Sequence, residues 1–196
     1  LGRDYPLAFH DYWLREFDFY GDTAFFAALP KGKETCQYAF FPGCQLGSGN
    51  PDRVLKGYEY LSGRFDTGVI LGCCGAPAYW AGDVQRLEEN ARRIKEAWER
   101  LGKPTLAFAC AYCLQIFETY LPDIPRVTVY ELLAQDETVK PAAPFGEAAI
   151  FDPCAAREEG GVQEAVRTLA ARSGVELEEL KEKFRCCGNG GHIRMA

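Results

Sequence analysis

Two pairs of adjacent cysteines, each followed by glycine, occur in the chain: Cys73-Cys74-Gly75 and Cys186-Cys187-Gly188. Each pair follows an earlier turn that carries a single cysteine, Pro42-Gly43-Cys44 in the first case and Asp152-Pro153-Cys154 in the second. Neighbouring side chains of a strand point to opposite faces, and a disulfide between adjacent cysteines is strained. The repeated pattern therefore predicts thiolates that converge on metal centres.

The first cysteine set also includes Cys110-Ala111-Tyr112-Cys113, so that it offers five thiols in groups of one, two and two. The groups are separated by 28 and 35 residues. A structural zinc ion or a simple cubane cluster needs four ligands, one fewer than this set provides. Two linked iron–sulfur subsites that share bridging thiolates could use all five.

Composition limits the classes of function. Nine cysteines in 196 residues favour metal binding or redox chemistry over a disulfide framework if the compartment is reducing. The net charge of -6 and the lack of a basic run argue against nucleic acid as a partner. No apolar stretch approaches the roughly 20 residues of a transmembrane helix, and residues 1–6 lack the apolar core of a signal peptide. We therefore expect a cytoplasmic protein without a transmembrane segment.

The order of elements predicts an α/β fold. An aromatic-rich N-terminal arm over residues 1–34 precedes a regular alternation of apolar segments and amphipathic segments. Such an alternation predicts a parallel sheet, and every cysteine motif lies just beyond the carboxyl end of a strand, where open α/β sheets build their sites. Strands are predicted at 35–41, 66–71, 105–109 and 126–130. One helix is predicted to start at Pro51 after the cap Asn50, a second to run from the cap Asp83 to Leu101, and a third to span 111–120.

A Pro/Ala stretch at residues 139–145 marks a boundary between two repeats. The second repeat begins with a predicted strand at 148–151, continues with a helix at 162–172, and has a charged segment at 176–183 that we predict to be helical. The domain prediction is an arm over 1–34, a first repeat over 35–138 and an incomplete second repeat over 146–196. The absence of a second Cys-x-x-Cys indicates a fragment of a longer polypeptide.

The order single cysteine, Cys-Cys-Gly and Cys-x-x-Cys resembles the cysteine-rich CCG domain over residues 36–196. That domain occurs in a subunit of heterodisulfide reductase and in the iron–sulfur subunits of anaerobic glycerol-3-phosphate dehydrogenase, glycolate oxidase and the lactate utilisation complex. In the family, the five cysteines of a complete motif hold a noncubane [4Fe–4S] cluster, and some members bind zinc at one motif. The resemblance also implies two similar parallel-sheet halves, the second of them truncated here.

The resemblance implies site residues of two kinds. One cluster would be bound by Cys44, Cys73, Cys74, Cys110 and Cys113. A second metal site, at which zinc is an alternative, would use Cys154, Cys186 and Cys187. Arg157 is expected near Cys154, where a cation lowers the pKa of a thiol, although it could equally be a solvated residue at a helix start. Cys36 is expected to be a buried structural thiol.

The implied function is an electron-transfer or disulfide-reductase module of an oxidoreductase complex, similar to the CCG subunit of heterodisulfide reductase. Flavoprotein or iron–sulfur partner subunits would supply the electrons, because no Gly-x-Gly-x-x-Gly follows a predicted strand. Two alternatives stay open: a zinc- or thiol-stabilised interaction domain without redox activity, and a thioredoxin-type redox pair at Cys110 and Cys113. The sequence identifies no catalytic residue.

Overall fold

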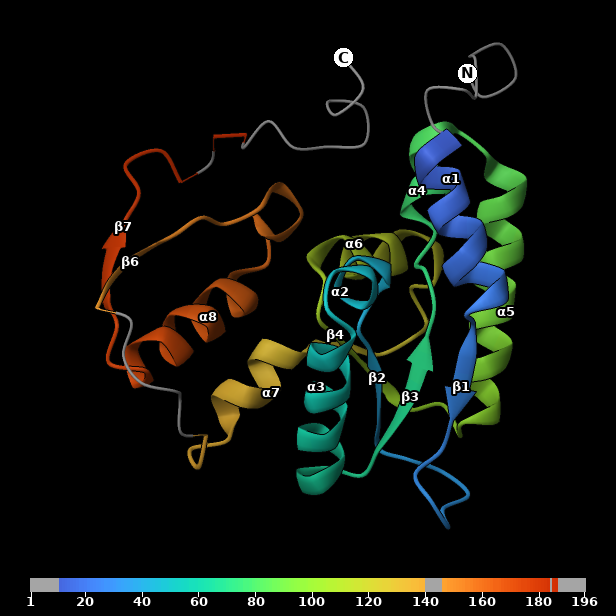
Figure 1. The fold of residues 1–196 in the computed structure, drawn as a ribbon, viewed down its shortest axis with the longest axis horizontal. Helices are drawn as coiled ribbons and strands as arrows, with labels where there is room; N and C mark the ends of the chain where they lie inside the picture. The colour runs from blue at the N-terminus through green and yellow to red at the C-terminus, as the bar shows by residue number, and fades with distance from the viewer. Residues whose placement is uncertain (1–10, 140–145, 184, 187–196) are drawn as a thin grey trace. The chain divides into compact units, whose positions relative to one another are not determined.

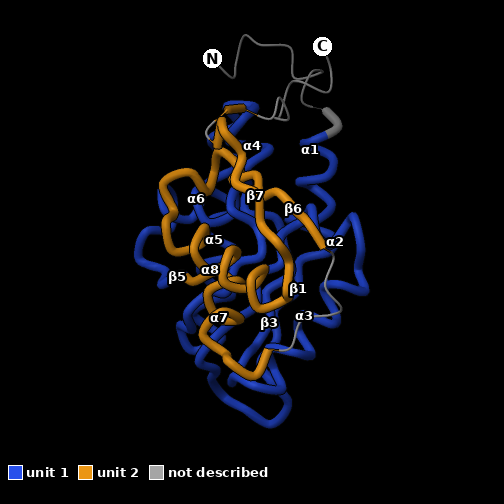
Figure 2. The backbone as a smooth tube through the Cα atoms, turned by 90° about the vertical axis from the view of Figure 1, so that its left-hand side faces the viewer, with its two compact units in different colours: residues 1–126, 189–196 blue, residues 127–188 orange. Residues whose placement is uncertain are grey.

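A computed structural model describes residues 11–139, 146–183 and 185–186 of the chain. The chain divides into two compact units, the first ending at Arg126 and the second beginning at Val127 (Figures 1 and 2). Both contain helices together with parallel strands, as the sequence predicts. No helix within the described ranges combines the length and the apolar character that crossing a bilayer requires.

The first unit is built on a five-stranded sheet with the order β1-β3-β2-β4-β5. Strand β2 (Tyr38–Phe41) lies at its centre and pairs in parallel with β3 (Thr67–Leu71) and with β4 (Thr105–Phe108). The short strand β5 (Arg126–Thr128) contains the boundary to the second unit. Because the central strands are parallel, their carboxyl ends lie at the same edge of the sheet.

Two long helices connect these strands, and each begins at the residue that the sequence predicts. Helix α3 (Pro51–Arg64) is capped by Asn50, whose side chain accepts a hydrogen bond from the amide of Arg53. Helix α5 (Val84–Arg100) is capped in the same way by Asp83. Such caps satisfy amides that would otherwise lack partners. The helices α3 and α5 lie on opposite sides of the sheet (Figure 1).

Buried aromatic rings fix helix α6 (Ala111–Tyr120) against the sheet. Phe41 ends β2, Phe108 ends β4, and Phe117 lies on α6, and all three side chains are fully buried. Their ring centroids are 4.7 to 5.3 Å apart, the spacing of favourable aromatic pairs. This cluster positions the start of α6 beside the ends of β2 and β4.

The aromatic N-terminal segment belongs to the same unit. Helix α1 (Asp11–Asp18) and the π-helical turn η2 (Phe19–Thr23) lead into strand β1 (Phe26–Ala28). Strand β1 pairs antiparallel with β3 and extends the sheet at its edge. Leu14 and Phe17 of α1 are buried, so this face of the helix contributes to the core.

The second unit contains a two-stranded parallel sheet and two packed helices. Strand β6 (Glu147–Ile150) pairs with β7 (Glu176–Glu179), and helix α8 (Gly160–Arg172) connects them after a 3-10 turn, η3 (Cys154–Ala156). Helix α7 (Val129–Gln135) starts with a capping box between Thr128 and Glu131. The helix predicted for residues 176–183 is wrong, because Glu176–Glu179 pairs along β6 as a strand.

An arginine links the elements of the second unit. Arg167 of α8 donates hydrogen bonds to both carboxylate oxygens of the buried Asp152, at 3.1 and 2.7 Å. It also donates two to Glu179 at the end of β7, at 2.5 and 2.9 Å. The hydrogen bonds from Arg167, followed by that from Lys183, lower the pKa of Glu179 from 4.5 to about 2.

We expect the substitution Arg167→Met to destabilise the second unit by about 3 kcal/mol, because it leaves the buried Asp152 carboxylate without its cation. It should also change the pH dependence. Since the folded pKa of Glu179 is depressed, its ionised form stabilises the fold above pH 4.5, and this stabilisation is lost as the pH falls towards 2. Hydrogen exchange of the α8 amides at several pH values measures both effects.

The matched control is Arg172→Met on the same helix, since Arg172 is exposed and donates to the backbone carbonyl of Asp136. This variant should exchange like the wild type at every pH. Equal protection of α8 in the Arg167 and Arg172 variants would show that the Asp152–Arg167–Glu179 network does not stabilise the unit.

Candidate metal centre at the strand ends

The cysteines of the first set follow the carboxyl ends of three neighbouring strands and so lie at one edge of the sheet. Cys44 is the first residue of the short helix α2 (Cys44–Gly49), and two residues separate it from the end of β2. Cys73 and Cys74 lie between β3 and helix α4 (Ala76–Ala81). Cys110 is the N-cap of α6 after β4, and Cys113 lies in the first turn of that helix. The strand order β3-β2-β4 makes these three segments spatial neighbours.

The five thiols are in contact. Cys73 Sγ donates to Cys44 Sγ at 3.7 Å, and its interactions with Cys44 and then Cys74 raise the pKa of Cys73. The interaction with Cys113 lowers the pKa of Cys74, and it lowers the pKa of Cys110 to about 7. The interactions with Cys110 and then Cys74 raise the pKa of Cys113. The five sulfurs of the first cysteine set therefore form a continuous series of neighbours.

A cavity of about 130 Å³ adjoins these thiols, and aromatic rings form much of its wall. Trp13 of α1 meets Trp80 of α4 edge to face at 6.0 Å, and Trp80 meets Tyr112 of α6 at 5.4 Å. These rings line the cavity together with Cys44, Cys74, Cys110 and Cys113. The rings limit access of water to the thiols, so the aromatic N-terminal segment contributes directly to this site.

The donor set fits an iron–sulfur cluster. Cysteine thiolates are soft ligands that select iron–sulfur clusters, zinc or Cu(I). In the described part of the chain, no three or more His, Cys, Asp or Glu side chains are gathered so that they could hold one metal ion. Four of the five thiols line the cavity, and the fifth, Cys73, contacts Cys44, so the set offers one sulfur more than a four-coordinate ion uses.

Two glycines beside the cysteines have backbone conformations and close contacts that a side chain would disturb, Gly43 against a thiol and Gly75 against α5. Gly43, directly before Cys44, has φ 78° and ψ 162°, a conformation almost restricted to glycine. A Cβ atom on Gly43 would lie 3.0 Å from Cys113 Sγ. Gly75, directly after Cys74, has φ 100°, and a Cβ there would lie 2.6 Å from Leu87 Cδ1. Both positions therefore require glycine.

Asn90 of α5 holds the Cys73-Cys74 turn through a buried hydrogen bond. The side chain is 2% exposed, and its Nδ2 donates to the carbonyl oxygen of Cys73 at 2.9 Å. Its Oδ1 is buried and has no hydrogen-bond partner among the described residues. The geometry makes Asn90 a positioning residue for the turn that carries two of the thiols.

We expect Asn90→Ala to lower the free energy of unfolding by about 1–3 kcal/mol, because it leaves the buried Cys73 carbonyl without a donor. It should also lower iron retention after reconstitution, since the two thiols lose their fixed backbone. Urea denaturation and iron analysis of the same preparations measure these effects. Glu88→Ala on the exposed face of α5 is the control and should match the wild type. An Asn90→Ala protein with wild-type stability and iron content would contradict this role.

The second cysteine set is described only in part. Cys154 is the first residue of η3 and is exposed, and Cys186 is exposed as well. Cys187 lies outside the described residues. Arg157 donates to Cys154 Sγ at 3.6 Å, so the predicted cation does lie beside this thiol.

Cys36 is separate from the first set, as the sequence predicts. It lies before the amino end of β2, is buried, and donates to the carbonyl oxygen of Leu101 at 3.8 Å. Burial raises the pKa of its thiol. Cys36 is thus a packed thiol at the opposite end of the strand.

Sequence reasoning missed several residues that shape the site. The importance of Trp13, Trp80 and Asn90 depends on tertiary contacts between α1, α4, α5 and the cysteine turns. The dense aromatic composition of residues 1–34 was a usable signal for Trp13, whereas Asn90 sits on α5 with no local feature that distinguishes it.

Curated relatives are redox proteins. One subunit of the fumarate reductase (CoM/CoB) of Methanothermobacter marburgensis is 29% identical over 172 residues, covering 79% of this chain and 33% of that protein. One subunit of the dihydromethanophenazine:CoB–CoM heterodisulfide reductase of Methanosarcina barkeri is 27% identical over 189 residues, covering 84% and 46%. The EtfAB:quinone oxidoreductase of Syntrophomonas wolfei is 25% identical over 182 residues, covering 83% and 25%. The chain spans less than half the length of each of these relatives.

No solved structure gives a significant match. The model of a cysteine-rich domain, CCG, matches residues 38–118 and 148–196, which make up more than half of the chain. The first matched segment contains all five clustered thiols and leaves out Cys36, and the second contains Cys154, Cys186 and Cys187. The chain therefore belongs to the CCG family of cysteine-rich domains.

Proposed function

We propose that the chain is an iron–sulfur electron-transfer module of an oxidoreductase complex, and that its first cysteine set holds the cluster. The observation that carries the proposal is the convergence of five thiols at the carboxyl ends of β2, β3 and β4. A noncubane [4Fe–4S] cluster accounts for five ligands where a cubane needs four. When bound, such a cluster supplies a site that takes up and releases single electrons.

The chain's own residues hold and shield this site. The ligands are Cys44, Cys73, Cys74, Cys110 and Cys113. Trp13, Trp80 and Tyr112 limit access of water, which matters because solvent exposure and hydrogen bonding set the potential of such clusters. Asn90 fixes the backbone of Cys73.

Other subunits of the complex would exchange electrons with this chain. Flavoprotein or iron–sulfur subunits are the proposed electron donors, and a disulfide or a quinone is the proposed class of acceptor. The names of the relatives support this, since they are a fumarate reductase (CoM/CoB), a heterodisulfide reductase and an EtfAB:quinone oxidoreductase. We place the module in the cytoplasm, where eight described free thiols would stay reduced.

The second repeat would form a similar half with its own metal site. Its proposed ligands are Cys154, Cys186 and Cys187, with zinc as an alternative occupant. The two separate family matches support tandem halves at 35–138 and 146–196 after an N-terminal arm over 1–34. A parallel strand–helix–strand unit, β6-α8-β7, is what such a half would share with the first.

Reductive titration under anaerobic conditions tests the proposed function. The chain reconstituted with iron and sulfide should absorb visible light, lose this absorption on addition of dithionite, and regain it on addition of an oxidant. A folded protein that binds zinc, stays colourless and takes up no electrons would instead be an interaction domain without redox activity.

A further inference from the structure

Helix α2, which begins at the proposed ligand Cys44, has little stability of its own. Its sequence is Cys-Gln-Leu-Gly-Ser-Gly, and glycine is among the poorest helix formers. The N-cap residue, Gly43, makes no side-chain hydrogen bond to the first amides, and Cys44 is the only buried residue of the helix. A helix this short is not stable in isolation in water. Contacts with other elements must therefore hold Cys44 in place.

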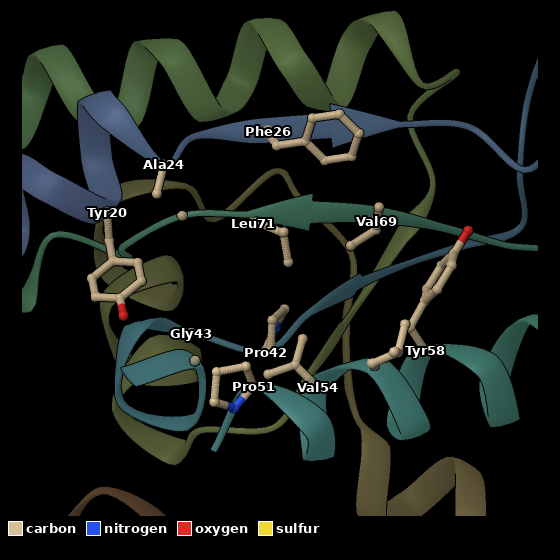
Figure 3. A pocket seen from close by; sticks show the side chains of 13 residues that line it. Tyr20, Ala24, Phe26, Pro42, Gly43, Pro51, Val54, Tyr58, Val69 and Leu71 are labelled. Atoms are coloured by element: carbon tan, nitrogen blue, oxygen red, sulfur yellow. The ribbon is translucent and has the colours of Figure 1, made fainter. Parts of the chain in front are cut away.

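The N-terminal segment supplies such contacts through two side chains. Glu16 of α1 accepts a hydrogen bond from Gln45 Nε2 at 2.9 Å, and its carboxylate also interacts with Ser48. Tyr20 of η2 interacts with Ser48 as well. Figure 3 shows the Tyr20 ring pointing toward α2, and a Cβ on Gly47 would lie 3.7 Å from Tyr20 Cε1. Both side chains thus contact the part of α2 that follows the ligand.

Glu16 is placed to act on the ligand through the neighbouring residue, Gln45. The Glu16 side chain is half-buried; burial raises the pKa of its carboxyl group, and Gln45 and Ser48 act in the opposite direction. The hydrogen bond therefore forms in a partly dry environment, where it is electrostatically stronger than in water. Removal of the carboxylate would leave Gln45 without this partner and would loosen the helix that begins at Cys44.

Glu16 and Tyr20 lie outside the segments that match the CCG family model, the first of which begins at residue 38. Their contacts with α2 are therefore additional to what the family model describes. The N-terminal segment would contribute to the site twice, through the Trp13 ring at the cavity and through Glu16 at α2.

We propose that Glu16 is a positioning residue for the Cys44 ligand: it holds α2 through Gln45 and Ser48 and thereby fixes the Cys44 thiol beside the other sulfurs. The inference rests on the proposed function, because it takes Cys44 to be a ligand of the cluster. The contact between Glu16 and α2 can nevertheless be tested in a chain without a cluster, so the two proposals can fail separately.

Alkylation of the anaerobic, cluster-free chain by iodoacetamide tests this role, with mass spectrometry of the peptides to follow each thiol. Cys44 is 8% exposed, so loosening of α2 should make it react faster. We expect Cys44 to react about threefold to tenfold faster in Glu16→Ala than in the wild type, the factor that one lost hydrogen bond gives. Glu16→Gln should restore the wild-type rate, because the glutamine oxygen accepts from Gln45 in the same way.

Cys36 is the internal reference in every sample. It is 7% exposed, in the same unit, and lies before the amino end of β2, away from α2. Its rate of alkylation reports general opening of the unit and should be the same in all variants.

Asp18→Ala is the matched control on the same helix. It also removes a carboxylate of α1, but this carboxylate pairs with Arg86 of α5 at 3.3 Å. The rate at Cys44 should not change, since an exposed ion pair contributes little to stability. Gln45→Ala should match Glu16→Ala, and because Gln45 is exposed this variant serves if Glu16→Ala does not fold. The double variant should react no more than about twofold faster than Glu16→Ala, because both changes remove the same interaction.

The reconstituted chain gives a second readout. Glu16→Ala should lose iron to a chelator about threefold to tenfold faster than Asp18→Ala. The circular dichroism of the cluster in the visible range should also change in Glu16→Ala and return to the wild-type spectrum in Glu16→Gln, since this signal reflects the geometry of the ligands. A loss of global stability alone would not change the spectrum of the cluster that stays bound.

Three results would overturn the inference: equal reactivity of Cys44 in the wild type and Glu16→Ala, equal acceleration in Asp18→Ala, or parallel acceleration of Cys36. Iron analysis keeps the two proposals apart. Wild-type iron uptake with unchanged Cys44 reactivity contradicts this inference alone. Faster reaction of Cys44 in a chain that takes up no iron contradicts the proposed function and leaves the contact between Glu16 and α2 standing.

Discussion

Alanine in place of any one of the five clustered cysteines will prevent stable iron incorporation. Each thiol contacts another member of the set, so the loss of one leaves the remaining ligands unable to enclose the cluster. Loss of a residue that only hydrogen-bonds to a metal ligand lowers the affinity for the metal about 10–100-fold. Loss of a ligand itself should lower this affinity at least as much. We expect iron retained after a chelator challenge to fall at least about tenfold in Cys44→Ala, Cys73→Ala, Cys74→Ala, Cys110→Ala and Cys113→Ala.

Cys36→Ala is the matched control. Cys36 is also a buried free thiol in the first unit, but it contacts the carbonyl oxygen of Leu101 and not the other sulfurs. Its iron content should equal that of the wild type, although removal of a packed sulfur will lower stability slightly. If any of the five alanine variants retains as much iron as Cys36→Ala, the five-ligand assignment fails.

The second large effect is expected for Gly43→Ala. A residue with a side chain is strained by about 1–3 kcal/mol in the conformation of Gly43, and the new Cβ would press on Cys113 Sγ at 3.0 Å. Overpacking of this kind adds about 1–3 kcal/mol. We therefore expect the variant to lose about 2–6 kcal/mol of stability and most of its iron, as measured by urea denaturation and iron analysis.

Gly49→Ala is the control that separates the close contact at Gly43 from a general effect of replacing a glycine in this segment. Gly49 is the last residue of helix α2, whose N-cap is Gly43, and a Cβ at Gly49 meets nothing within 4 Å. This control should be as stable as the wild type or slightly more stable, since alanine is the better helix former. Equal iron content in the Gly43 and Gly49 variants would show that the backbone at Gly43 does not need to approach the thiols.

The first cysteine set could be predicted because short sequence segments indicate the strands, turns and helix starts around it. Turns such as Pro42-Gly43-Cys44 follow short apolar strands, and caps such as Asn50 and Asp83 mark the helix starts. Parallel strands then bring the following turns to one edge. The convergence of thiols from three separate segments follows from this topology, and the structure agrees.

Other features depend on contacts that no local pattern encodes. Residues 176–179 are three glutamates and one leucine, which favour a helix, yet pairing with β6 makes them a strand. Strand β1 could not be predicted within the aromatic segment, because three residues are too few to show an alternating pattern. The support of the Cys73 carbonyl by Asn90 joins residues 17 positions apart and is visible only in the folded chain.

Native mass spectrometry of the anaerobically reconstituted chain tests the central claim most directly. The proposal predicts a mass increase that corresponds to several irons with inorganic sulfide on the intact chain, and loss of that increase in Cys73→Ala but not in Cys36→Ala. A chain that carries a single zinc ion without sulfide, or the same iron and sulfide in both variants, would contradict the claim that the five thiols at the strand ends hold an iron–sulfur cluster.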